Sequence, residues 1–351
     1  MKIFFANLNG LPPYSLSGAE ITIDDFLSIF SKNGHEVLSV NCNEKWNFYH
    51  NNYKNIYNEE ADIIQENENY TKYFFHSTES FRINIKRILE RFEPDYIFSQ
   101  LNFLEEFTEY CEICKKCRII YFIHSNLTIG KNSNSHIDIL LSNKVYKVIC
   151  LSRYILSTLP YELQKKSEVV YPIFDKNKLC NPKENGEYIL FFNPIAIKGV
   201  DIVIELSKIF KNEKFVIYET WNHITQAYKA KIEAQRNIIL QNNLENYFEV
   251  YRDVKIYLLP SQCEEGFGRG IVEANISGIP IVASDIGGIK EASGKNQLLV
   301  HRFWDINEWE EKLQILLDDD NYKRYSKYGF ENSKRFLCEN KVKELLQIIK
   351  E

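Results

Sequence analysis

CEEGFGRGIVEANISGIPIVASDIGGIKE, residues 263–291, decides the fold of this chain. This stretch contains the apolar run 281–284, and another apolar run, 255–260, lies just before the stretch begins. Both runs have the character of buried parallel strands. Gly278 and Pro280 end the helix that is predicted between these strands. In an open α/β sheet, the loops leaving the carboxyl ends of the strands line the ligand-binding crevice. The stretch therefore predicts a parallel α/β sheet with a binding site at its two glycine turns.

Two carboxylates, Glu265 and Glu273, flank the first turn, which carries Gly266 and Gly268. Glycine lets the backbone approach a ligand closely, and backbone N–H groups near a helix start bind anions. Carboxylates accept hydrogen bonds from hydroxyl groups. This combination indicates an anionic, hydroxyl-rich ligand.

The spacing E-x7-E within E-G-F-G-x-x-x-x-E-A, followed by G-I-P-x-V-A-S and G-G-x-x-E, resembles the signature of retaining glycosyltransferases of family four. The resemblance implies an α/β protein of the GT-B fold, with two Rossmann-like domains whose parallel sheets face a central cleft. A generic βαβ unit with ordinary capping glycines is the alternative, and the ordered succession of these features argues against it.

Length and pattern agree with two domains, because 351 residues exceed the usual size of a single core. Strands and helices alternate in the first half, a polar linker covers 177–185, and the alternation restarts at Tyr188. The resemblance implies that the final helix crosses back to the first domain. We therefore expect an N-terminal acceptor-side domain of residues 1–176 plus 334–351, and a nucleotide-sugar-binding domain of residues 177–333.

Composition excludes several classes of protein. A net charge of −5 and the lack of a dense basic stretch argue against nucleic-acid binding. The N-terminus runs straight into a predicted strand, and no apolar run has the length of a transmembrane helix. The sequence predicts a cytoplasmic protein. A basic helix over 80–92, with an apolar stripe, is expected to pack on the N-terminal sheet; peripheral contact with the inner face of the cell membrane is the alternative.

Three of the eight cysteines, Cys111, Cys114 and Cys117, have the C-x2-C-x2-C spacing of an iron–sulfur site. The segment around them has helical periodicity, so they would share one helical face and not wrap a cluster. We expect reduced thiols, no bound metal and no cofactor.

The resemblance also implies the chemistry. A hexosyl group would move from a nucleotide-diphosphate sugar, such as a UDP- or GDP-sugar, to a saccharide or lipid-linked saccharide. Negative charge develops on the departing diphosphate, so cations and N–H groups must be aimed at it. Lys198 stands where the family has the phosphate-binding lysine of its R-x4-K-G motif; a solvated lysine at a helix start is the alternative. The usual arginine is replaced by Asn193, and Arg269 is a candidate to restore the charge.

Other roles are carried over from the family. Glu273 matches the acid that accepts hydrogen bonds from the ribose hydroxyls. Glu265 matches the acid that orients the transferred sugar, without acting as a nucleophile. His124 either faces the donor sugar or simply caps its strand. The predicted catalytic residues are Lys198, Glu265 and His124, and the predicted donor-binding residues are Gly18, Asn193, Lys198, Gly266, Phe267, Gly268, Arg269, Glu273, Gly287 and Gly288.

The expected function is retaining hexosyl transfer in the synthesis of surface polysaccharide or another glycoconjugate. Two alternatives stay open. One is a non-catalytic nucleotide-sugar-binding protein, for which Asn193 is the hint. The other is a GT-B sugar-nucleotide epimerase, which would need further acid–base groups.

Overall fold

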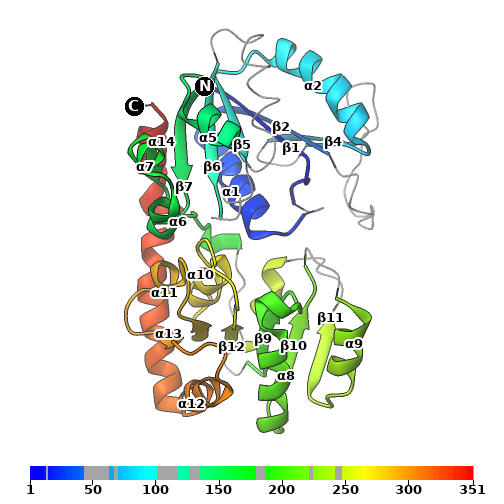
Figure 1. The fold of residues 1–351 in the computed structure, drawn as a ribbon, viewed down its shortest axis with the longest axis vertical. Helices are drawn as coiled ribbons and strands as arrows, with labels where there is room; N and C mark the ends of the chain where they lie inside the picture. The colour runs from blue at the N-terminus through cyan, green and yellow to red at the C-terminus, as the bar shows by residue number, and fades with distance from the viewer. Residues whose placement is uncertain are drawn as a thin grey trace. The chain divides into compact units, whose positions relative to one another are not determined.

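The computed structural model describes residues 1–12, 15–42, 63–66, 70–100, 117–125, 134–178, 186–220, 224–241 and 247–350 (Figure 1). The chain divides into two compact units. Unit 1 consists of Met1–Ile173 and Val342–Glu351, and unit 2 consists of Phe174–Lys341. The predicted domain limits were 176/177 and 333/334, so the division between the units falls three residues earlier at the first limit and eight residues later at the second.

Unit 1 contains a sheet with the strand order β3-β4-β2-β1-β5-β6-β7-β8. Its strands are β1 (Lys2–Asn7), β2 (Glu36–Cys42), β3 (Ile63–Glu66), β4 (Thr71–Phe75), β5 (Tyr96–Gln100), β6 (Arg118–Ile123), β7 (Val145–Cys150) and β8 (Ser167–Val169). The described pairs are parallel except for β3 with β4, which is antiparallel. Its helices are α1 (Gly18–Lys32), α2 (Thr78–Phe92), α5 (Asn134–Leu141), α6 (Arg153–Thr158), α7 (Tyr161–Lys166) and the end of α14 (Cys338–Lys350).

Helices cover both faces of this sheet, so successive residues of its central strands β1 and β5 are buried. On one face, Phe30 of α1 packs on Phe98 of β5, with 5.5 Å between the ring centroids. On the other face, Phe92 of α2 packs on Phe4 of β1 at 6.1 Å. Phe4 points away from Phe98 because Phe98 pairs with the next residue of β1, and successive side chains of a strand alternate.

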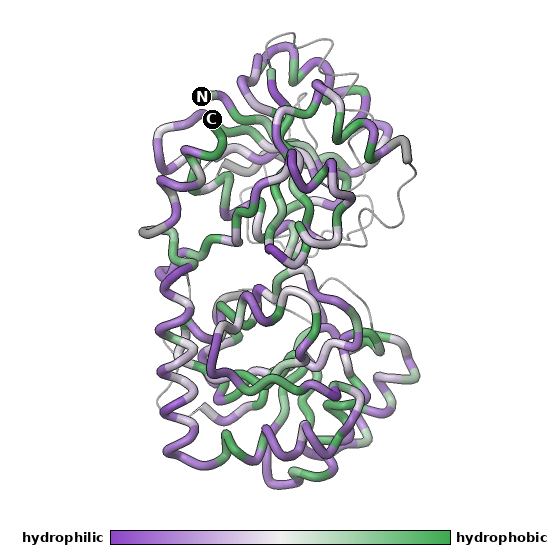
Figure 2. The backbone as a smooth tube through the Cα atoms, turned by 60° about the vertical axis from the view of Figure 1, so that its left-hand side comes forward, coloured by the Kyte–Doolittle hydropathy of each residue, from purple (hydrophilic) through white to green (hydrophobic). Residues whose placement is uncertain are grey.

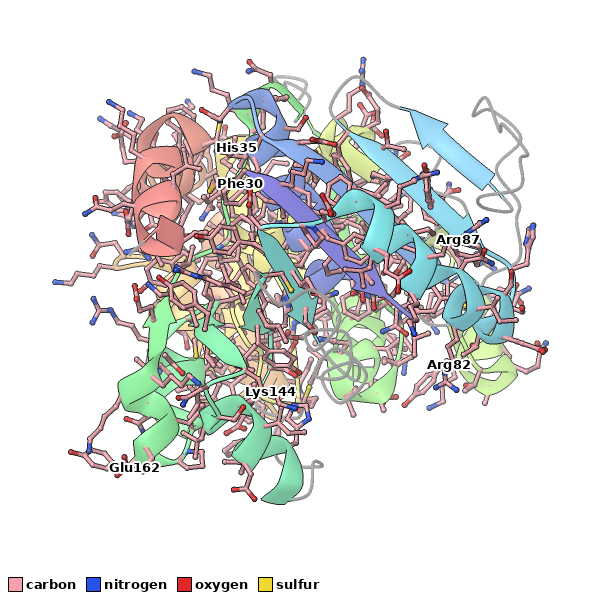
Figure 3. All side chains as sticks on the ribbon, turned by 90° about the horizontal axis from the view of Figure 1, so that it is seen from above. Phe30, His35, Arg82, Arg87, Lys144 and Glu162 are labelled. Atoms are coloured by element: carbon pink, nitrogen blue, oxygen red, sulfur yellow. The ribbon has the colours of Figure 1, made fainter. Side chains whose placement is uncertain are left out.

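The basic helix α2 packs its apolar stripe on the sheet, as expected from the sequence. Phe81, Ile85, Ile88 and Leu89 are all buried. Arg82 and Arg87 lie on the outer side of the helix (Figure 3). The stripe is therefore covered by the protein itself. In the part of the chain that the structure describes, no helix is both long and apolar enough to cross a membrane.

Unit 2 contains a parallel sheet with the strand order β11-β10-β9-β12-β13-β14. Its strands are β9 (Tyr188–Phe192), β10 (Lys214–Tyr218), β11 (Ile238–Gln241), β12 (Val254–Leu259), β13 (Ile281–Ser284) and β14 (Leu298–Val300). Its helices are α8 (Val200–Ile209), α9 (Gln226–Glu233), α10 (Arg269–Ile276), α11 (Ile289–Ser293), α12 (Ile306–Leu316) and α13 (Asp319–Ser333). The strands predicted on either side of the glycine-rich turn are thus confirmed as β12 and β13.

The helices of unit 2 differ in how deeply they are buried. Trp309 of α12 is completely buried in a core that joins α8 and α12 to the sheet. By contrast, α13 is mostly purple, hence hydrophilic, in the lower left of Figure 2. Only two residues of α13, Gly329 and Ser333, are buried. The helix therefore covers the unit with one narrow face.

Two distant chain segments meet where the units divide. The Phe174 N–H donates to the Phe336 carbonyl at 3.0 Å, and the Cys338 N–H donates to the Phe174 carbonyl at 2.9 Å. Beyond this point, α14 continues into unit 1, where Lys147 donates to the Ile348 carbonyl and Ile349 is completely buried.

Candidate functional site

The loop that follows β12 is held against the loop that follows β9. Gly199 has a φ of 85°, and a Cβ added there would lie 2.0 Å from the Pro260 carbonyl oxygen. Only glycine meets both demands, the left-handed conformation and the close backbone approach. The Gln262 N–H also donates to the Ile197 carbonyl at 2.9 Å. These contacts fix Lys198 beside residues 260–265.

Lys198 and Glu265, predicted from separate motifs, form an ion pair. The Lys198 Nζ lies 2.6 Å from Glu265 Oε1, and Ser261 donates its hydroxyl to the same oxygen. The two side chains are 17% and 15% exposed. This pair is therefore mostly buried but still partly exposed at the carboxyl edge of the sheet.

Asn193 follows β9 in the left-handed conformation, with a φ of 61°. Asparagine tolerates this conformation better than most residues. Its Oδ1 accepts a hydrogen bond from the Thr220 hydroxyl at 2.6 Å, and its N–H donates to the Tyr218 carbonyl at 2.9 Å. Asn193 thus joins the ends of β9 and β10, which gives it a structural role that the sequence did not reveal.

Arg269 and Glu273 form a second, deeply buried pair on α10. Arg269 Nη2 and Nε lie 3.0 and 3.1 Å from Glu273 Oε1, and Tyr251 donates its hydroxyl to Oε2 at 2.8 Å. The guanidinium also lies over the Phe174 ring, 4.5 Å from its centroid. The Glu273 side chain is 0% exposed and that of Arg269 is 7% exposed. Glu273 is thus bound by Arg269 and Tyr251, and its contact with ribose stays a prediction.

Tyr257 stands near both acids. Burial raises the pKa of Tyr257 well above its usual value, and the negative charges of Glu265 and Glu273 raise it further. A Cβ on Gly270 would lie 2.5 Å from the Tyr257 hydroxyl oxygen. Tyr257 is therefore a neutral phenol that fills the space beneath α10.

The second glycine turn packs on the first. A Cβ added to Gly287 would lie 2.4 Å from the Glu265 carbonyl oxygen, and one added to Gly288 would lie 2.2 Å from the Gly266 carbonyl oxygen. The Gly288 N–H donates to the Glu265 carbonyl at 2.7 Å. These glycines are thus required by contacts within the protein, and their contact with a donor stays a prediction. The buried Phe267 packs edge-on against Phe336, with 5.3 Å between ring centroids.

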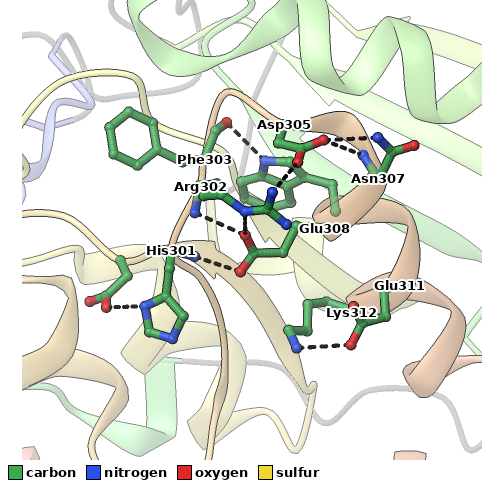
Figure 4. Close-up of polar contacts among 10 residues, drawn as sticks. His301, Arg302, Phe303, Asp305, Asn307, Glu308, Glu311 and Lys312 are labelled. Carbon is green, nitrogen blue, oxygen red and sulfur yellow. Dashed lines mark hydrogen bonds and ion pairs between the residues drawn. The ribbon is translucent and has the colours of Figure 1, made fainter.

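The loop after β14 completes this edge of unit 2. His301 Nδ1 lies 2.6 Å from Asp285 Oδ2, and Gln262 donates its amide to the Phe303 carbonyl at 3.0 Å. Figure 4 shows Glu308 accepting hydrogen bonds from the N–H groups of His301 and Arg302. Gln262 and Asp285 each follow a predicted strand, whereas β14, which places His301 at this edge, was not predicted from the sequence.

Gly18 and His124 belong to unit 1. Gly18 is the exposed first residue of α1, and His124 is half-buried directly after β6. Near Gly18, the buried Glu20 accepts a hydrogen bond from the Ser17 hydroxyl. Burial raises the pKa of Glu20 to about 7, although its own backbone and the side chains of Asn7 and Asn9 oppose this shift.

The structure describes the cysteine motif only in part. Cys111 and Cys114 lie outside the described residues, and Cys117 is half-buried next to β6. Within the described ranges, no group of three or more His, Cys, Asp or Glu side chains is placed to hold a metal ion.

Comparisons with known proteins agree with the geometry of unit 2. Residues 175–332 match the family model described as glycosyl transferases group 1. The chain is 26% identical over 222 residues to an uncharacterised glycosyltransferase of Methanocaldococcus jannaschii, covering 58% of this chain and 59% of that protein. It is 24% identical over 326 residues to an uncharacterised 42.6 kDa protein in the cps region of Klebsiella pneumoniae, covering 80% and 84%.

Among solved structures, HepE of Anabaena in complex with UDP and glucose has a TM-score of 0.77 and 16% sequence identity, covering 100% of this chain and 99% of that one. At this identity the likeness concerns the fold. The fold is GT-B, as the signature predicted. The match over residues 175–332 relates this part of the chain to the glycosyl transferases of group 1, and the assignment to family four stays a prediction.

Proposed function

We propose that this chain is a retaining glycosyltransferase that transfers a hexosyl group from a nucleotide-diphosphate sugar to a saccharide or lipid-linked saccharide. The observation that carries the proposal is the partly exposed pair of Lys198 and Glu265 at the carboxyl edge of the unit 2 sheet. The Anabaena protein in complex with UDP-glucose, a structural neighbour, favours a UDP-sugar donor. The relative in a cps region of Klebsiella pneumoniae favours surface polysaccharide as the product.

In the proposed reaction, the Lys198 ammonium leaves Glu265 and donates hydrogen bonds to the departing diphosphate. Glu265 then accepts hydrogen bonds from hydroxyls of the transferred sugar and so orients it. The bond between the anomeric carbon and the phosphate oxygen breaks as the acceptor oxygen bonds to the same face of that carbon. The leaving phosphate oxygen takes the proton of the acceptor hydroxyl. Lys198 acts electrostatically, because charge develops on the diphosphate in the transition state. No step uses a metal.

The test is a panel of UDP- and GDP-sugars incubated with the full chain and candidate saccharides. Release of nucleoside diphosphate is measured with and without acceptor, and the anomeric configuration of the product is determined by NMR. We expect acceptor-dependent release and an unchanged configuration. Binding without release would support the non-catalytic alternative, and interconversion of the donor would support an epimerase. Inversion of configuration would contradict the mechanism.

A further inference from the structure

The buried pair of Arg269 and Glu273 lies where a cation is otherwise unfavourable. Arg269 is the first residue of α10, and the positive end of a helix dipole opposes a cation at that place. Nevertheless its guanidinium is 7% exposed and directs two nitrogens to Glu273 Oε1. The carboxylate balances a charge that the local backbone does not favour.

The two acids of the E-x7-E spacing are neutralised in the same way. Glu265 is paired with Lys198, and Glu273 is paired with Arg269. A nucleoside diphosphate arriving at this loop finds each of these cations already paired with a carboxylate. The N–H groups that now point at the carboxylates can point at the diphosphate only if the cation leaves its acid.

We propose that Arg269 changes partner when a nucleoside diphosphate binds: it leaves Glu273 for the diphosphate, and Glu273 takes the ribose hydroxyls in its place. The inference rests on the proposed function. It assigns to Arg269 the guanidinium that position 193 lacks, since Asn193 is neutral and its Oδ1 is bonded to Thr220. Guanidinium groups suit this exchange because they bind carboxylate and phosphate in the same planar, two-pronged geometry.

The exchange couples the two ends of the ligand. Removing one partner from a buried ion pair leaves an uncompensated charge, which is strongly unfavourable. Uridine alone offers hydroxyls to Glu273 but nothing to Arg269, and pyrophosphate alone offers the reverse. UDP satisfies both groups at once. Its affinity should therefore exceed what the two fragments suggest separately.

Calorimetric titration of the full chain with UDP and with uridine tests the exchange, with weak uridine binding measured by displacement of UDP. For Arg269→Met, which keeps an unbranched apolar stem and removes the charge, we expect UDP affinity to fall about 10- to 100-fold, because charge-assisted hydrogen bonds to phosphate are lost. Uridine affinity should not fall, because the arginine no longer competes for Glu273. Arg324→Met, at an arginine of α13 that donates to the Asn321 side chain, should change neither affinity.

Equal losses of UDP and uridine affinity in Arg269→Met would overturn the exchange, since they would indicate a structural role alone. Arg269→Lys guards against misfolding because it keeps the charge. This variant should retain part of the preference for UDP over uridine. Complete loss of that preference in the folded variant would count against the exchange. If the unmodified protein binds no nucleoside diphosphate, the proposed function fails; if it binds UDP but the variants lose both ligands equally, only the exchange fails.

Discussion

At the scale of single residues, removal of the Lys198 ammonium should lower turnover the most. Lys198→Ala should lower kcat by about 10²- to 10³-fold, the usual effect of losing one preorganised donor to a developing negative charge. Lys208→Ala is the matched control, because this lysine is exposed on the surface of α8 and is paired there with Glu205. Unchanged turnover in folded Lys198→Ala would remove the lysine from the mechanism.

Glu20 should make the stability of the protein depend on pH. Its pKa rises from 4.5 to about 7 on folding, so between these values the folded chain holds a proton that the unfolded chain releases. Stability therefore falls as pH rises through this window, by up to about 3 kcal/mol. Glu20→Gln should remove that slope. Unfolding by urea at pH 5 and pH 8 measures it, with the exposed Glu90→Gln on α2 as a control that keeps the slope. If the free energy of unfolding changed equally with pH in the Glu20 variant and in the unmodified protein, the buried carboxyl would not be protonated.

The sequence predicts individual residues of the site unevenly. Lys198 and Glu265 could be brought together because each follows a strand, and adjacent parallel strands end at one edge of a sheet. The pairing of Arg269 with Glu273 could also have been foreseen, since residues four apart on a helix face each other. The contact of the Arg269 guanidinium with the Phe174 ring could not, because Phe174 is distant in the chain and is brought there by tertiary packing.

At the scale of elements, the glycine turn at 287–288 packs against the turn at 266–268, and Gly288→Ala should disrupt this packing. Its φ of −77° suits alanine, so the conflict is steric: the new Cβ would lie 2.2 Å from the Gly266 carbonyl oxygen and 3.0 Å from the Phe267 Cα. We expect a lower turnover together with weaker donor binding, because the loop that carries Glu265 must shift. Gly34→Ala is the contrasting control: a Cβ there meets nothing within 4 Å, and its φ of 79° costs about 1 kcal/mol of stability without changing activity. Normal kinetics in Gly288→Ala would show that the loop adapts without consequence.

Elements also show where sequence patterns fail. The segment 41–80 gives no clear periodicity, yet it contains β4, whose residues 71–75 pair with β2. A five-residue strand is too short to show a clear alternation of apolar and polar residues. Its conformation is selected by pairing with the edge of β2. In contrast, α2 was predicted from its apolar stripe because a helix repeats the pattern over several turns.

At the scale of the whole chain, the last helix connects the two units covalently and belongs at its end to unit 1. The apolar positions of residues 331–351 predict that this segment is packed, and the structure buries Ile349 completely. The surface that receives it could not be deduced from the segment, because an amphipathic helix fits many apolar faces. Its attachment follows from a long-range contact, the hydrogen bond from Lys147 to the Ile348 carbonyl.

Ile349→Ala should therefore destabilise unit 1, although the residue stands near the end of the sequence. Removing a fully buried isoleucine side chain costs about 2–5 kcal/mol, depending on how far the cavity collapses. Lys343→Ala, in the same helix at an exposed position, should change stability by less than about 0.5 kcal/mol. Limited proteolysis at rising temperature separates the units: the Ile349 variant should lose protection within 1–173 before 174–341. Equal protection of unit 1 in both variants would mean that the end of α14 contributes nothing to its core.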